Sequence, residues 1–241
     1  MESEEIRPAK KELRRTIRRR LDEFPFEEQE RESQAVSATF VRRPEWSESS
    51  DVLLFLSMTG EIDTRGLLQA AIDAGKRVWA PRMHGREMEF HLIWGGERSG
   101  TSEGPGTPDD QSTAGPARVP PLSFLDLTYN PYGIWEPLKS SPVFTGAADA
   151  GKAGPRGGCI MAAPGLAFDR SGGRLGRGKA YYDKWLSRHA ELLETGRLVA
   201  IGIGFSIQLV DEVPCAANDK KLPQLIIGGA HISCSHSGQA G

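Results

Sequence analysis

The sequence PGLAFDRSGGRLGRGKAYYDKW, residues 164–185, decides how this chain is organised. The short apolar run before it, residues 159–163, has the length of a buried strand. Apolar residues after it recur at helical spacing from Tyr182 to Leu193. The stretch is therefore predicted to form a strand, a glycine-rich turn and a helix.

Glycines and cations alternate in this turn. They are Gly172, Gly173, Gly176 and Gly178, with Arg174, Arg177 and Lys179 among them. Glycine lets the backbone approach a ligand closely, and amide groups at a helix start beside Arg and Lys form a phosphate site. Asp183 follows one turn into the helix, where a carboxylate could hold a magnesium ion. A glycine-rich surface loop with solvated charges is the plain structural alternative.

Two common nucleotide motifs fit the turn poorly. A Walker A loop would need Ser or Thr after Lys179 to ligate magnesium, and that residue is Ala180. A dinucleotide fingerprint starting at Gly176 would need a third glycine where Tyr181 stands. The sequence therefore supports neither of these two nucleotide-binding folds.

Composition indicates a soluble globular chain. At 241 residues with 38% hydrophobic content, it can bury one good core, and a net charge of −2 gives no general reason to bind nucleic acid or membrane. Its three cysteines are far apart and fit neither a metal site nor a disulfide framework, as expected of a cytoplasmic protein. We find no secretory signal and no apolar run long enough to span a bilayer.

The N-terminal half predicts helices and a β–α–β unit. Residues 9–21 form an amphipathic pattern that places Lys10 and Arg14, four apart, on one face. Residues 27–41 predict a second helix, and residues 51–58 a buried parallel strand. The other expected elements are a helix from an N-cap at Thr64 to Ala74, stopped at Gly75, a strand over 77–80 ended by Pro81, and an edge strand over 88–94.

The C-terminal half continues the same alternation. Residues 198–205 and 225–227 predict two more strands. Two long loops rich in Gly, Ser and Pro are predicted earlier in the chain, over residues 95–121 and 140–158. We expect one α/β domain over residues 1–232, with a mainly parallel central sheet and helices on both faces, and a disordered polar tail over 233–241.

The central stretch resembles the 5-formyltetrahydrofolate cyclo-ligase family, also called methenyltetrahydrofolate synthetase. PGLAFD at residues 164–169 and RLGRGKAYYD at residues 174–183 match the family pattern, except that Ala180 replaces its usual glycine. Other segments match too: KKELR near the N-terminus, E-x-D-T from Glu61, GIWEP ending at Pro137, and the Asn218–Asp219 pair. Pro223 stands where the family often has another aspartate.

The resemblance implies ATP-dependent cyclisation of 5-formyltetrahydrofolate to 5,10-methenyltetrahydrofolate, through a phosphorylated formyl oxygen. Lys179, Arg177 and Tyr181 are its expected catalytic residues, and Asp183 and Asp219 its Mg²⁺ ligands. The expected ATP-binding residues are Lys10, Arg14, Arg174, Leu175, Gly176, Arg177, Gly178, Lys179, Ala180, Tyr181 and Tyr182. The expected folate-binding residues are Leu56, Glu61, Trp135, Arg177, Gly178, Lys179, Ala180 and Tyr181.

Several residues keep a structural interpretation beside the functional one. Glu61 could be a solvated loop acid, Trp135 a packing residue and Asp219 an Asx-turn aspartate. For Ala180 we expect a helical backbone, because helical periodicity already holds from Tyr181 onward. A binding paralogue without efficient turnover and a sugar-phosphate isomerase-like enzyme are the alternative functions, and we expect a monomer.

Overall fold

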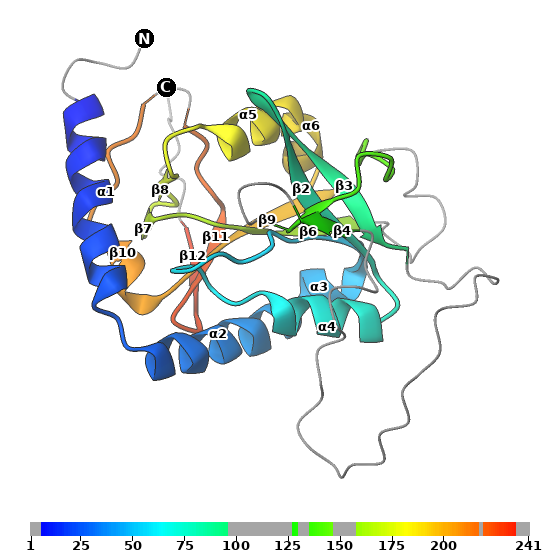
Figure 1. The fold of residues 1–241 in the computed structure, drawn as a ribbon, viewed down its shortest axis with the longest axis horizontal. Coiled ribbons are helices and arrows are strands. Elements are labelled where there is room, and N and C mark those ends of the chain that lie inside the picture. The colour runs from blue at the N-terminus through cyan, green and yellow to red at the C-terminus, as the bar shows by residue number, and fades with distance from the viewer. Residues whose placement is uncertain (1–5, 96–126, 130–134, 147–157, 217–218, 235–241) are drawn as a thin grey trace.

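The computed structural model describes residues 6–95, 127–129, 135–146, 158–216 and 219–234. A seven-stranded sheet forms its centre (Figure 1). In spatial order the strands are β12 (Ala230–Ser233), β11 (Gln224–Ile227), β9 (Leu198–Gly204), β6 (Gly158–Ala163), β1 (Ser49–Leu53), β2 (Arg77–His84) and β3 (Glu87–Trp94). The inner pairs are parallel, and β3 and β12 pair antiparallel at the two edges.

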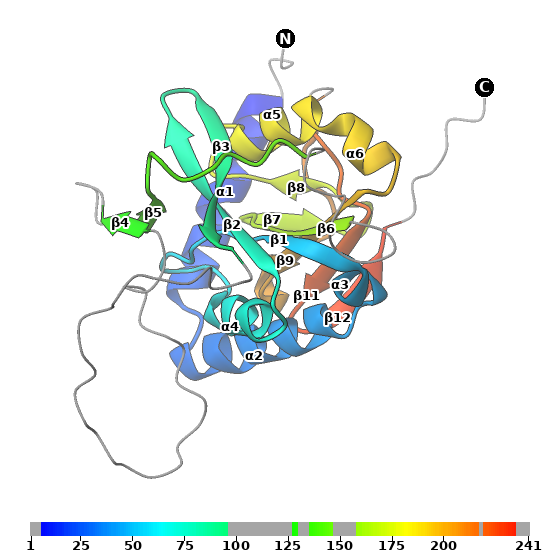
Figure 2. The same cartoon turned by 90° about the vertical axis from the view of Figure 1, so that its right-hand side faces the viewer.

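Helices cover both faces of this sheet, as Figures 1 and 2 show. One face carries α2 (Phe26–Val41), α3 (Pro44–Glu48) and α4 (Arg65–Asp73), and the other carries α5 (Tyr181–Arg188) and α6 (Ala190–Glu194). Helix α1 (Ile6–Asp22) stands beside a small sheet of β10 (Leu209–Val210), β7 (Ala167–Asp169) and β8 (Arg174–Leu175). The α/β fold with a mainly parallel sheet and helices on both faces is confirmed.

The continuous apolar runs are explained by two cores, one on each face of the sheet. Side chains alternate along a strand, so Val52 and Ile160 belong to the core beneath α2 and α4. Their neighbours Leu53 and Met161 belong to the core beneath α5 and α6. A strand buried on both faces has no polar side to show, which is why residues 159–163 are apolar throughout.

Two sequence-based strand boundaries differ in the structure. Strand β1 ends at Leu53; Leu54 and Phe55 are buried outside any strand, and Leu56 is half-buried, so the apolar run reflects burial of the irregular segment after the strand as well as the strand itself. Strand β2 continues past Pro81, because its pairing with β1 ends at Trp79 and leaves only β3 beside the proline.

Other predicted boundaries can be compared residue by residue. Thr64 occupies the N-cap position of α4, but its hydroxyl donates to the Phe55 carbonyl oxygen at 2.7 Å and caps nothing. Gly75 has a φ of +65°, as predicted for the stop of this helix. Strand β12 was not predicted, and it extends to Ser233, one residue into the predicted tail.

Some predictions lie outside the described residues. They are most of the loops over 95–121 and 140–158, the tail beyond Cys234, and Asn218. A short hairpin of β4 (Leu127–Tyr129) and β5 (Trp135–Pro137) lies between the two loops. In the described part of the chain, no helix is both long and apolar enough to cross a membrane.

The glycine turn is anchored by Asp169, a buried carboxylate at the end of β7. It accepts hydrogen bonds from the Ser171 amide and hydroxyl, the Gly173 amide and the Val213 amide, at 2.7–3.0 Å. A side chain at Gly173 would place its Cβ 2.3 Å from the carboxylate. Burial alone would raise the pKa of Asp169, but the hydrogen bonds from Ser171, Val213 and Gly173 hold it below its ordinary value.

We predict that Asp169→Asn lowers the free energy of unfolding at pH 7 by about 2–3 kcal/mol, because an amide nitrogen would face a backbone donor. A lowered native pKa stabilises the protein above the unfolded pKa of about 3.9 and loses that effect as the pH falls. The difference between wild type and variant should therefore be full near neutrality and shrink below about pH 4. Urea unfolding across this range measures it.

The control is Asp73→Asn, which removes a carboxylate that is bonded to Gln69 on the surface of α4. It should change stability by less than about 0.5 kcal/mol. Equal effects of the two variants would show that Asp169 does not anchor the turn.

Candidate active site

The site lies where the strand order of the central sheet reverses. The chain runs from β1 outward to β2 on one side, and later from β6 to β9 and β11 on the other. Segments that leave the carboxyl ends of β1 and β6 must therefore diverge, and open α/β sheets bind ligands in the resulting crevice. The segment after β1 contains Glu61, and the segment after β6 leads into the glycine turn.

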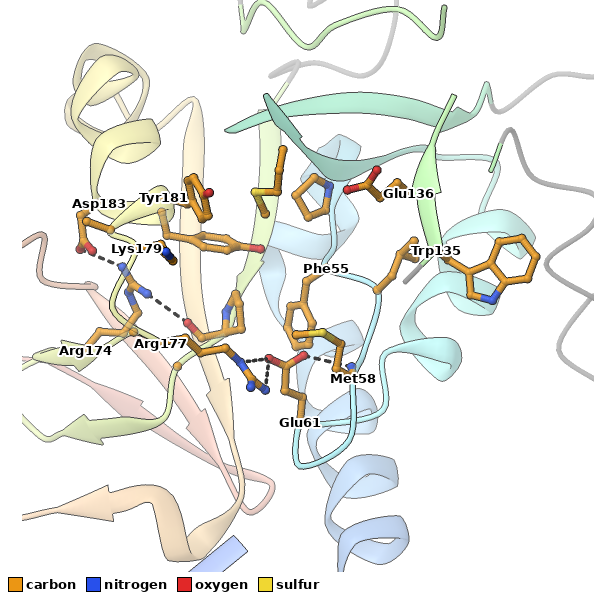
Figure 3. A pocket seen from close by; sticks show the side chains of 18 residues that line it. Phe55, Met58, Glu61, Trp135, Glu136, Arg174, Arg177, Lys179, Tyr181 and Asp183 are labelled. Atoms are coloured by element: carbon orange, nitrogen blue, oxygen red, sulfur yellow. Dashed lines mark hydrogen bonds and ion pairs between the residues drawn. The ribbon is translucent and has the colours of Figure 1, made fainter. Parts of the chain in front are cut away.

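An apolar cavity occupies this crevice (Figure 3). Its lining comes from the segments after β1 and β6, from β2 and β5, and from the glycine turn with the start of α5. The lining residues are Phe55, Leu56, Met58, Glu61, Pro81, Met83, Trp135, Glu136, Pro164, Gly165, Arg174, Gly176, Arg177, Lys179, Ala180, Tyr181, Tyr182 and Asp183. Apolar walls with a few charged groups suit a largely aromatic ligand.

An ion pair joins two sides of this cavity. The Arg177 guanidinium donates through Nε and Nη2 to Oε1 of Glu61, at 3.1 and 2.9 Å, and the Met58 amide donates to Oε2 at 3.1 Å (Figure 3). The Glu61 side chain is only 11% exposed. A carboxylate offers about four acceptor positions, so Glu61 retains one for a ligand donor.

A polar cavity lies on the other side of the glycine turn. Helix α1 supplies four of its cations from one face, on which residues three and four apart are neighbours. The lining residues are Arg7, Lys10, Lys11, Arg14, Arg174, Leu175, Gly176, Gly178, Ala180, Asp183 and Asp219. Arg14 ties the helix to the turn, since its Nε donates to the Gly176 carbonyl oxygen at 3.0 Å. Clustered cations beside a glycine turn are suited to phosphate groups.

The glycine turn is the wall between the two cavities, because Arg174, Gly176, Ala180 and Asp183 line both. The Arg174 side chain is 2% exposed and donates through Nη2 to Oδ1 of Asp183 at 2.8 Å. Its Nη1 donates to the carbonyl oxygen of Pro164 at 3.2 Å. One buried guanidinium thus links the segment after β6 to the start of α5.

The predicted residues divide between the cavities. Of the predicted ATP-binding residues, Lys10, Arg14, Arg174, Leu175, Gly176, Gly178 and Ala180 line the polar cavity. The rest, Arg177, Lys179, Tyr181 and Tyr182, line the apolar one. All the predicted folate-binding residues line the apolar cavity except Gly178.

Two predicted aromatic residues have partners of their own. The Tyr181 hydroxyl donates to the Gly85 carbonyl oxygen at 3.0 Å and so ties α5 to the β2–β3 hairpin. The Trp135 indole packs edge-on against Tyr129, with ring centroids 5.1 Å apart, and Figure 3 shows it turned away from the cavity.

The two predicted metal ligands line the polar cavity, each with a cationic partner. Asp183 accepts from Arg174, and Oδ2 of Asp219 accepts from Lys10 Nζ at 2.7 Å and from the Ala216 amide at 2.6 Å. Among the described residues, no cluster of three or more His, Cys, Asp or Glu side chains is placed to hold a metal. Two carboxylates still suit Mg²⁺, which commonly takes one or two from the protein and the rest from water and phosphate.

Several cavity residues were not predicted. Arg7 and Lys11 share the face of Lys10 and Arg14, so helical spacing alone could have found them. Glu136 lies in the GIWEP segment that matched the family pattern, but no role was predicted for it. Met58 and Met83 carry no comparable motif, because a loop and a hairpin bring them to the cavity only through the fold.

The comparisons with known proteins agree with this arrangement. The model of the 5-formyltetrahydrofolate cyclo-ligase family matches residues 6–228. The chain belongs to the 5-formyltetrahydrofolate cyclo-ligase family. It is 26% identical to a probable 5-formyltetrahydrofolate cyclo-ligase of Caenorhabditis elegans, over 94% of this chain and 96% of that one. It is 24% identical to the 5-formyltetrahydrofolate cyclo-ligase of Mus musculus, over 92% of this chain and 94% of that one.

A solved structure shares the fold of this cyclo-ligase family member. The structure of Aquifex aeolicus 5,10-methenyltetrahydrofolate synthetase matches with a TM-score of 0.65 at 23% identity, over 96% of this chain and 95% of that one.

The prediction for Ala180, where this family member departs from the family glycine, is wrong. Its φ is +54° and its ψ is +26°, a left-handed conformation, and the residue is the N-cap of α5. Helical periodicity identified the helix correctly but not its first residue. The chain must turn from Gly178, with a φ of +108°, into the helix, and Ala180 completes that turn.

We therefore predict that Ala180→Gly stabilises the protein by about 0.5–1 kcal/mol, because alanine in the left-handed region carries a strain of about 1–2 kcal/mol that glycine avoids. Thermal unfolding of the two proteins measures the difference. A matched control is Ala190→Gly at the start of α6, where glycine should destabilise. A lower melting temperature for Ala180→Gly would contradict the observed backbone conformation.

Proposed function

We propose that this protein catalyses the ATP-dependent cyclisation of 5-formyltetrahydrofolate to 5,10-methenyltetrahydrofolate, with release of ADP and phosphate. The observation that carries the proposal is the pair of unlike cavities that share the glycine turn as a wall. The reaction needs a nucleotide and a large aromatic substrate side by side, with a phosphoryl group passing between them. Family membership supports the same activity.

The polar cavity is the proposed ATP site. Lys10, Arg14 and Arg174 would neutralise the phosphates, and the turn would present backbone amides to them. Lys10 is nearly buried, at 8% side-chain exposure, so its charge is poorly screened by water. Helix α1 and the glycine turn would therefore bind the phosphates jointly, although Arg14 and Gly176 are 162 residues apart in the sequence.

The apolar cavity is the proposed folate site. Glu61 would accept a hydrogen bond from the N–H groups of the pterin ring, while Phe55, Leu56 and the methionines cover its faces. Arg177 lies opposite Glu61 and holds that carboxylate in place. Lys179, Arg177 and Tyr181 line this cavity, and we assign to them the stabilisation of charge that develops during transfer.

The chemistry needs little covalent participation from the protein. The formyl oxygen attacks the γ-phosphorus of ATP and ADP leaves, which converts the oxygen into a good leaving group. N10 then attacks the activated carbon and the five-membered ring closes; N10 releases its proton to solvent, and the phosphate departs with its oxygen. The enzyme aligns the reacting atoms and stabilises the transferred phosphoryl group with fixed cations.

Asp183 and Asp219 would hold Mg²⁺, which neutralises phosphate charge when bound. Both carboxylates line the polar cavity, and both are engaged by Arg174 and Lys10 in the structure. These cations fix the carboxylates at the wall that the phosphates would face. We further propose that the protein is a cytoplasmic monomer whose ligands are the folate and the nucleotide, without nucleic acid or membrane.

The direct test mixes purified protein with ATP, Mg²⁺ and 5-formyltetrahydrofolate and follows the absorbance of the methenyl product. ADP should appear in equal amount. The second candidate, a binding paralogue without efficient turnover, is favoured by the strain at Ala180. It predicts folate and ATP binding without product, and a gain in turnover for Ala180→Gly.

We predict that Glu61→Gln raises the KM for the folate, by an amount that corresponds to a loss of about 1–3 kcal/mol of binding free energy. The KM for ATP should stay within twofold, because the substitution removes a charged acceptor from one cavity only. Steady-state kinetics with each substrate varied in turn measures this. The control is Glu28→Gln, which breaks an exposed ion pair with Arg31 on α2. Equal rises in both KM values for Glu61→Gln would mean that Glu61 serves the fold and not the folate.

A further inference from the structure

Residues 58–61 form a tight turn that carries Glu61 at its end. The Glu61 amide donates to the Met58 carbonyl oxygen at 3.1 Å, and Gly60, the third residue of the turn, has a φ of +78°. A type II turn requires a positive φ at its third position. The Met58 amide donates in return to the Glu61 carboxylate at 3.1 Å, so the conformation of the turn decides where that carboxylate lies.

The neck of this turn is closed by one side chain, that of Ser57. Ser57 precedes the turn, and its hydroxyl donates at 2.8 Å to the carbonyl oxygen of Ile62, the residue that follows the turn. The same oxygen accepts from the Thr64 amide at 2.8 Å and lies 2.8 Å from the Thr64 hydroxyl oxygen. Between backbone groups of residues 57–64 the structure shows one hydrogen bond, and it lies within the turn itself. Ser57 thus supplies the link across the neck.

The residues that Ser57 contacts form a fixed base. Ile62 and Thr64 are buried, and the Thr64 hydroxyl donates to the Phe55 carbonyl oxygen at 2.7 Å. The Asp63 amide donates to the Ser33 hydroxyl oxygen on α2 at 3.0 Å. Because the base is held by the core and by a neighbouring helix, a bond from Ser57 to this base fixes the start of the turn as well as its end.

The other partner of Glu61 lies across the cavity and is less firmly held. The Arg177 side chain that bonds the Glu61 carboxylate is 44% exposed, and an exposed ion pair orders its partners only weakly. An acceptor that already points at its ligand loses less entropy on binding than one that the ligand must order. The closed neck therefore provides the preorganisation that this ion pair cannot supply alone.

We infer that Ser57 is a positioning residue for the folate, which acts by holding the turn that presents Glu61. This inference rests on the proposed function and adds a residue to its folate site. Ser57 lines neither cavity, so its hydroxyl acts through Glu61 and not through contact with a ligand. Without that hydroxyl, the Thr64 amide and the Ile62 carbonyl oxygen lose a partner, and the turn must be ordered when the folate binds.

The test is Ser57→Ala, which removes the hydroxyl and leaves the cavity lining unchanged. We expect the Kd for 5-formyltetrahydrofolate, measured by calorimetry without ATP, to rise at least fivefold. The Kd for a non-hydrolysable ATP analogue should stay within twofold, because no residue of the turn lines the polar cavity. The matched control is Ser47→Ala, which removes a hydroxyl bonded to the Pro44 carbonyl oxygen on α3 and should leave both Kd values within twofold.

A double-mutant cycle separates positioning from a general loss of structure. In a Glu61→Gln background, Ser57→Ala should change the folate Kd less than twofold, because the carboxylate that the turn positions is already gone. A rise of less than fivefold in the otherwise unaltered protein would overturn the inference. An equal rise in both backgrounds would overturn it too, since the hydroxyl would then act independently of Glu61.

A second measurement uses the unaltered protein and does not depend on how a variant folds. The amide hydrogens of Glu61 and Thr64 should be protected from exchange in the ligand-free protein, because the turn and its neck are closed before the folate binds. Free exchange that slows only when the folate is added would contradict the inference. Wild-type protein that binds the folate but forms no methenyl product would refute the proposed activity alone, and wild-type protein that binds no folate would refute both.

Discussion

The carboxylate of Asp169 is the constraint on which the site depends. Its hydrogen bonds bring the amides of Ser171, Gly173 and Val213 to one point, and so fix where the glycine turn leaves the small sheet. Gly172 must be glycine there for a second reason, because a Cβ would lie 2.1 Å from the Leu222 carbonyl oxygen. With the turn fixed, the residues after it can form the wall of two cavities without support from a ligand.

Arg174 extends this wall to the central sheet. Its guanidinium bonds Asp183 on one side and the Pro164 carbonyl oxygen on the other, and it lies over the Tyr182 ring. A charge at 2% exposure is tolerated only because these partners compensate for lost hydration. The same residue therefore serves the fold and lines both the polar and the apolar cavity, so it holds together the thin segment of chain that separates them.

The sequence predicted most of the fold because its apolar runs and helical periods are strong local signals. It failed where tertiary context decides: β1 stops at Leu53 although the apolar run continues, since the irregular segment after the strand is buried as well. Pro81 does not end β2, because its strand has a partner on one side only at that point. Ala180 shows the limit at a helix start, where periodicity cannot tell a cap from the first helical residue.

The motif residues predicted where the candidate site lies. The sequence did not predict how these residues divide between the two cavities. Arg177, Lys179 and Gly178 are adjacent in sequence, yet the first two line the apolar cavity and Gly178 lines the polar one. Such alternation follows from the left-handed backbone at Gly178 and Ala180, which no pattern of residue types reveals. Met83 reaches the site from a hairpin, so only the assembled fold could identify it.

The central claim is that one turn separates two binding sites that are filled together. Calorimetric titration of 5-formyltetrahydrofolate into the protein, alone and saturated with a non-hydrolysable ATP analogue and Mg²⁺, tests it most directly. The account predicts one folate site per chain in both titrations and a ternary complex, with a folate Kd no weaker when the nucleotide is bound. Loss of folate binding in the presence of the nucleotide would show that the two ligands compete for one cavity, and would contradict the account.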